Sequence, residues 1–274
     1  MTAIPTPAGF DIGRVLQRLF GVLGRNFVTF LVLSLLLVGL PTATVGVLQI
    51  IIQGPTLLNP AALDAKPNYA GFAIIPFVWL IGAAANAVLQ GAVIHGAVSD
   101  LSGRKASFGE ALGTGLRNLL PLIAVGLISA ICIFFGLLVF IVPGVLLALA
   151  WAVTTPALVV ERAGVFGAFA RSLELTRDCR IYIFALAIIA AVVGFIFSMI
   201  ASVFSFGGGF AIAAAGGGAN TAGLMGILVG QQIAAFITQT ASAMINSAGI
   251  ASVYYELRYV KEGVGAEQLA AVFD

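Results

Sequence analysis

The sequence predicts an all-α integral membrane protein with six transmembrane helices, arranged as three hairpins that each follow a cytoplasmic interfacial amphipathic helix. The first observation behind this prediction is composition: the chain is 61% hydrophobic and only 9% charged, whereas about 25% of residues in soluble domains are charged. The second is the length of the uncharged runs, which is sufficient to cross a bilayer. These runs cover residues 26–63, 67–99, 118–160 and 181–255. The third is that basic residues cluster between alternate pairs of spans.

The apolar runs place transmembrane helices at residues 27–52, 72–98, 118–140, 143–160, 180–205 and 222–252. We expect residues 1–274 to form a single polytopic membrane domain, with an interfacial helix at about 10–25 and a cytoplasmic tail at 253–274. Pro143 and Gly144 predict a tight turn between the third and fourth spans. Pro41 and Pro156 lie within spans, and because proline lacks a backbone N–H, each predicts a kink.

The distribution of lysine and arginine predicts the orientation of these spans. Twelve of the thirteen basic residues fall on one side, namely Arg14, Arg18, Arg25, Arg104, Lys105, Arg117, Arg162, Arg171, Arg177, Arg180, Arg258 and Lys261. Lys66 falls on the other side. Because cytoplasmic loops are enriched in basic residues, both termini are expected in the cytoplasm.

Three amphipathic segments precede the odd-numbered spans. They begin "GRVLQRLFGVLGRNF" (residues 13–27), "SFGEALGTGLRN" (residues 107–118) and "GVFGAFARSLELTRD" (residues 164–178). Their polar and apolar residues recur at helical spacing, as in helices that lie in the membrane interface. The same pattern is compatible with loop helices that pack on their own bundle.

Acidic residues recur at the inner ends of the even-numbered helices, as Asp100, Glu161 and Glu256, while Arg25, Arg117 and Arg180 begin the odd-numbered helices. Both signs of charge oppose the helix dipole. The orientation rule explains the arginines but not the acids. We therefore expect acids and arginines to pair across neighbouring hairpins, with solvated acids as the alternative.

The sequence contains no recognisable catalytic or metal-binding constellation. His95 precedes Ser99 and Asp100 on the same predicted helix, where three such residues cannot easily form an oriented relay, and no G-x-S-x-G elbow is present. The glycines of Gly207–Gly218 lack the G-K-[ST] ending of a phosphate loop. We expect no cofactor and no metal. A lipid enzyme that uses His95, Asp100 or Glu161 is the least favoured alternative.

The sixth predicted span carries an unusual polar face. Gln232, Gln239 and Asn246 are seven residues apart, and Ala235, Ser242 and Gly249 interleave with them. The second span carries Asn86 and Gln90. Small residues allow helices to approach and amides bond between them, which favours tight packing of these two helices or of two copies of the protein. The alternative is a polar path or site for a small solute or a lipid head group.

Residues 142–184, "VPGVLLALAWAVTTPALVVERAGVFGAFARSLELTRDCRIYIF", and residues 253–263, "VYYELRYVKEG", resemble a known family. They are similar to the membrane domain that precedes the catalytic domain in some bacterial glycerophosphodiester phosphodiesterases, and to its stand-alone relatives. The matching positions are Pro143, Gly144, Glu161, Gly164, Arg171, Ser172, Tyr255, Glu256 and Arg258. The resemblance implies a helical domain of the bacterial inner membrane. It carries no catalytic residues onto this chain.

These observations favour a non-enzymatic inner-membrane protein that binds or organises lipids or protein partners. The expected partners are membrane lipids, with other membrane proteins or a homo-oligomer left open, and no nucleic acid. A small-solute transporter or channel built around the polar face of the sixth helix is the alternative.

Overall fold

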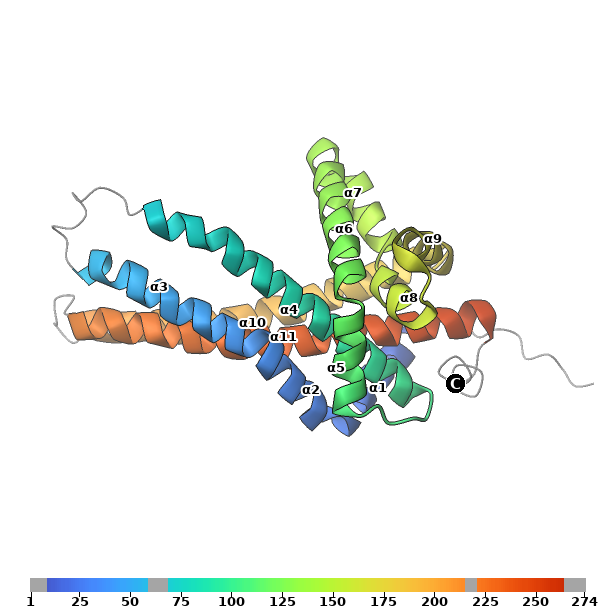
Figure 1. Ribbon diagram of the computed structural model, residues 1–274, viewed down its shortest axis with the longest axis horizontal. Helices are drawn as coiled ribbons and strands as arrows, with labels where there is room; N and C mark the ends of the chain where they lie inside the picture. Colours follow the sequence, from blue (N-terminus) through green and yellow to red (C-terminus); the bar gives the residue numbers. More distant parts are fainter. Residues whose placement is uncertain (1–8, 59–68, 215–220, 264–274) are drawn as a thin grey trace, which may run out of the picture.

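The computed structural model describes residues 9–58, 69–214 and 221–263, and every regular element in these ranges is a helix. Their order is α1 (Ile12–Arg25), α2 (Phe27–Ser34), the π-helix η1 (Leu35–Gly39), α3 (Leu40–Leu58), α4 (Tyr69–Leu101), α5 (Phe108–Arg117), α6 (Leu119–Val139), α7 (Ile141–Ala150), α8 (Thr154–Glu161), α9 (Gly164–Thr176), α10 (Arg180–Ala214) and α11 (Thr221–Glu262) (Figure 1).

Five stretches within the described residues are long and apolar enough to cross a membrane. They are Phe27–Leu48, Leu80–Leu101, Leu119–Val139, Ile141–Glu161 and Arg180–Ile200. The chain is therefore a multi-pass helical membrane protein. The predicted sixth span falls within α11 and is not among these five.

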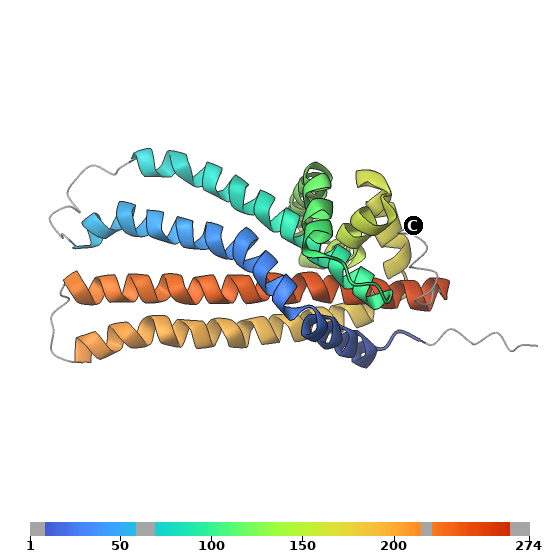
Figure 2. The same cartoon turned by 60° about the horizontal axis from the view of Figure 1, so that its bottom comes forward.

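The long helices α3, α4, α10 and α11 run beside one another (Figure 2). The central helix is α11, 42 residues long, which packs against α10, α4, α1 and α3. It continues without interruption to Glu262. The cytoplasmic tail predicted from residue 253 thus begins as about three more turns of helix, which bring Tyr254, Glu256 and Arg258 onto the same rod as the polar face.

All three predicted amphipathic segments are helical, as α1, α5 and α9. Asp11 caps α1 by accepting from the backbone N–H of Gly13 at 2.7 Å. Ser107 and Glu110 form a capping box at the start of α5, which satisfies two backbone donors that a helix start otherwise leaves unpaired. The apolar face of α1, with Val15 and Val22 buried, packs on α11 and α4. Packing on the bundle, the alternative left open above, therefore occupies this face.

Both prolines that predicted kinks lie at irregular points in the helices. The π-helix η1 ends just before α3, whose second residue is Pro41. Pro156 lies in the first turn of α8, after a turn at Trp151–Val153 that separates α7 from α8. The hydroxyl of Ser172 on α9 donates to the carbonyl of Ala150 at 2.8 Å and accepts from the N–H of Val153 at 3.3 Å. These bonds satisfy backbone groups that the break would otherwise leave unpaired.

The turn between α6 and α7 differs from the prediction. It lies at Phe140, whose backbone is extended, and Pro143 and Gly144 belong to the first turn of α7. Proline fits there because the N–H that it lacks would have no partner within the helix. Gly144 is needed for a close approach, since a Cβ on it would lie 2.6 Å from the backbone nitrogen of Leu137.

Candidate functional site

A buried carboxylate joins the first helix to the end of the last one. Glu256 on α11 is fully buried and accepts from Arg14 at 3.0 Å from Nε and 2.6 Å from Nη2, and also from Arg18. The hydrogen bond with Glu256 raises the pKa of Arg14. The guanidinium of Arg18 also lies over the ring of Tyr255, 4.8 Å from its centroid. Glu256 thereby holds α1 against α11.

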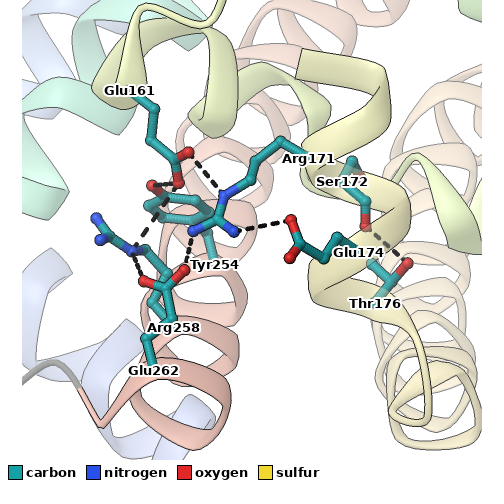
Figure 3. A network of polar contacts seen from close by, with 8 residues as sticks. All are labelled: Glu161, Arg171, Ser172, Glu174, Thr176, Tyr254, Arg258 and Glu262. Carbon is teal, nitrogen blue, oxygen red and sulfur yellow. Dashed lines mark hydrogen bonds and ion pairs between the residues drawn. The ribbon is translucent and has the colours of Figure 1, made fainter. Parts of the chain in front are cut away.

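A second cluster gathers around Glu161 at the end of α8 (Figure 3). Arg171 of α9 donates to it from Nε at 2.7 Å, and the hydroxyl of Tyr254 on α11 donates at 2.7 Å. Arg258 lies 3.9 Å from the same carboxylate and 2.7 Å from Glu262, which also pairs with Arg171. Burial, followed by the charge of Glu161, raises the pKa of Tyr254. The cluster ties α8 and α9 to α11.

Asp100 at the end of α4 makes the third pair. Arg25, the last residue of α1, donates to it from Nη2 at 2.5 Å and from Nε at 2.9 Å. Farther along, Lys261 donates to Asp178 at 3.0 Å, and this bond lowers the pKa of Asp178. The charge network therefore links α1, α4, α8, α9 and α11.

All three acids pair with arginines, but not with the predicted partners. Asp100 pairs with Arg25 of its own hairpin instead of a neighbouring one. Glu161 and Glu256 pair with arginines of the amphipathic helices instead of the arginines that begin spans. Arg117 is exposed, and Nε of Arg180 is buried without a hydrogen-bond partner within the described structure. The sequence places Arg14 and Arg18 four apart, on one helix face, but this spacing does not indicate which acid that face meets.

A cavity of about 500 Å³ lies between η1, α3, α4 and α11. Its polar lining consists of Thr42, Asn86, Gln232 and Gln239, and its apolar lining includes Leu37, Val38 and Val45. The described residues that line it include no charged side chain. The cavity therefore offers both uncharged hydrogen-bonding groups and aliphatic groups to a molecule that enters it.

Helix α11 packs closely against Gly39 and Gly46, two glycines near the residues that line the cavity. Gly39 and Gly46 are seven residues apart and face α11: a Cβ on Gly39 would lie 2.8 Å from the ring of Phe236, and one on Gly46 would lie 2.7 Å from Cδ of Gln232. Pro41 and Thr42 lie between the two glycines and line the cavity. The local change from π-helix to α-helix thus coincides with the opening.

The predicted polar face divides into two parts. Gln232, Gln239 and Asn86 line the cavity, and Gln90 donates to Asn86 at 2.8 Å one turn away on α4. Gln239 is exposed at the edge of this lining, whereas Ser242 and Asn246, also exposed, lie outside it. Thr42 was missed, because a single threonine in an apolar span gives no periodic signal. His95 is half-buried in α4, and Asp100 beside it is engaged by Arg25.

Comparison of the chain with profiles of known protein families, with curated proteins and with solved structures gives no match. The resemblance to the phosphodiesterase membrane domain therefore stays a prediction. The established description is that of a multi-pass helical membrane protein.

Proposed function

We propose that this protein is a non-enzymatic inner-membrane protein that binds an uncharged amphiphile, a lipid or lipid-like molecule, in the cavity between α3, α4 and α11. The observation that carries the proposal is the lining itself. Amide groups of Asn86, Gln232 and Gln239 offer donors and acceptors, while Leu37 and Val45 offer aliphatic contact. Cavities of this size suit small ligands with a few oriented polar groups. A lining without charge favours hydroxyl, ester or carbonyl groups over ionised ones, because an unpaired ion in such a site is costly.

The charge network supports a regulatory or organising role over an enzymatic one. Asp100 and Glu161, the acids that a catalytic alternative would use, are both engaged by arginines. Those pairs connect separate helices and so stabilise the inner end of the bundle. Unchanged lipid turnover in a His95→Ala strain is the expected result for a protein without a catalytic step.

We also infer that α11 crosses the bilayer beside α10. The two helices pack side by side along much of their length (Figure 2), and α10 contains the apolar stretch Arg180–Ile200. Of the polar side chains of α11 that would be costly in lipid, Gln232 and Gln239 line the cavity. The clusters around Glu256, Glu161 and Asp100 gather toward one end of the bundle, which supports cytoplasmic placement of that end and of both termini.

Photolabelling tests the proposed ligand. The purified protein in nanodiscs is irradiated with a diazirine-bearing monoacylglycerol, which is neutral, or with the corresponding fatty acid, which is anionic. The expected result is labelling by the neutral probe at peptides that contain residues 37–45, 82–86 and 232–239. Loss of this labelling in Gln239→Leu, with labelling retained in Asn246→Leu, locates the probe in the cavity. Labelling spread evenly over lipid-facing residues in all variants would contradict the proposal.

A second function, passage of a small uncharged solute, is favoured by the π-helical turn that borders the cavity. Single π-helical turns within α-helices are frequent at functional sites. Liposome flux separates the two functions: solute flux that is lost in Gln232→Leu and Gln239→Leu, with folding retained, would favour transport. Amphiphile binding without passage predicts no flux in the wild type.

A further inference from the structure

The hairpin of α6 and α7 is strongly apolar, and little of the stretch Leu119–Val139 in α6 is buried. Its buried residues in α6 are Leu122 and Val125, both in the first two turns. Beyond them, apolar side chains are exposed around the helix and its turn, including Leu127, Phe134, Leu138, Phe140 and Ile141. A helix that is apolar on all sides requires an apolar environment on all sides.

The hairpin runs across the long helices instead of beside them. In both Figure 1 and Figure 2, α6 and α7 extend little along the direction shared by α3, α4, α10 and α11. The contact at this crossing is close: a Cβ on Gly91 of α4 would lie 2.9 Å from Cδ1 of Leu122 on α6. Two sets of helices that cross in this way cannot both span one flat bilayer.

We propose that the α6–α7 hairpin does not cross the bilayer but lies within its cytoplasmic leaflet, surrounded by lipid acyl chains, while α3, α4, α10 and α11 cross. A hairpin that leaves and returns on the same side changes no other part of the topology. The proposal is independent of what the cavity binds.

The depth of the crossing supports this arrangement. The hairpin contacts α4 at Gly91, through Leu122 of α6. Gly91 lies within the apolar stretch Leu80–Leu101, nine residues and therefore about 14 Å before Asp100 of the charge network, which is about half the thickness of the hydrocarbon core. Charged residues flank the hairpin, Arg117 on one side and Glu161 on the other, with none in the sequence between them. The uncharged stretch 118–160 therefore covers the hairpin and most of α8, which leads back to Glu161 in the charge network.

Depth-dependent quenching tests the proposal. Single cysteines replace Leu120, Leu127 or Leu138 on α6, all exposed, in a Cys132→Ala, Cys179→Ala background. Each is labelled with a small fluorophore in liposomes that contain phosphatidylcholine with a nitroxide at carbon 5 or carbon 12 of the acyl chain. The matched series is Ile181, Ile188 and Phe195, which are exposed on α10 and seven residues apart.

A hairpin within one leaflet predicts the same quenching ratio at all three α6 positions, while the ratio changes with position along α10. A ratio that is shallow at Leu120 and Leu138 but deep at Leu127 is the signature of a crossing helix and would overturn the proposal. Lack of quenching by either lipid at the α6 positions would also overturn it, because another protein copy would then cover the hairpin.

Discussion

Glu256 and Arg14 are 242 positions apart in the sequence, yet Nε of Arg14 lies 3.0 Å from Oε1 of Glu256. The Glu256 side chain is fully buried, whereas the Arg14 side chain is 31% exposed. Arg18 pairs with the other carboxylate oxygen. The first amphipathic helix is thus attached to the last helix through a single acid that has two basic partners.

Glu256→Gln should lower the free energy of unfolding by about 2 kcal/mol, less than the ~3–5 kcal/mol typical of a fully buried pair. The smaller value is expected because water reaches both arginines once the carboxylate is gone. Equilibrium unfolding in mixed micelles measures this change, and Glu174→Gln, whose side chain is 72% exposed, serves as the comparison. Equal stability of Glu256→Gln and wild type would show that the attachment of α1 contributes nothing.

A double-mutant cycle should reveal coupling between Glu161 and Arg171. The expected coupling free energy is about 1 kcal/mol for Glu161→Gln with Arg171→Gln, since contacting charges are not additive. The corresponding cycle with Arg117→Gln should give a value near zero, because Arg117 is exposed and makes no ion pair with Glu161. Coupling to Arg117 in place of Arg171 would contradict the geometry around Glu161.

Two glycines of α5 should respond in opposite ways to alanine. Gly115→Ala places a methyl group against the backbone carbonyl of Val88 and should destabilise the protein by about 1–3 kcal/mol, as overpacking does. Gly113 has no atom within 4 Å of such a Cβ, so Gly113→Ala should stabilise by about 0.5–1 kcal/mol through helix propensity. Thermal unfolding of the detergent-solubilised variants distinguishes them. If both variants melted at the same temperature, the close contact of α5 with α4 would be wrong.

The all-helical membrane architecture, the amphipathic helices and the helix irregularities at prolines could be predicted from the sequence because each depends on local chemistry. Hydropathy, helical spacing and the missing N–H of Pro41 and Pro156 act within a few turns. The partners of Glu161 and Glu256 could not be predicted in this way, since they depend on how α1 and α9 lie on α11. The direction of the α6–α7 hairpin likewise depends on the contact between Leu122 and Gly91, which are distant in sequence.

The heptad spacing of Gln232, Gln239 and Asn246 predicts a shared helix face but not its surroundings. Those depend on α3, where Gly39 and Gly46 permit close packing and Pro41 and Thr42 open the space between. As a result, the face divides into amides in the cavity and amides outside it. This division provides a matched pair of variants on one helix.

Equilibrium binding of a fluorescent monoacylglycerol to the protein in nanodiscs tests the proposed function most directly. Gln239→Leu should weaken binding about tenfold, which corresponds to the loss of one hydrogen bond worth ~1.4 kcal/mol, and Asn246→Leu should bind as the wild type does. Equal affinity in all three proteins, or an equal loss in both variants, would contradict binding in the cavity.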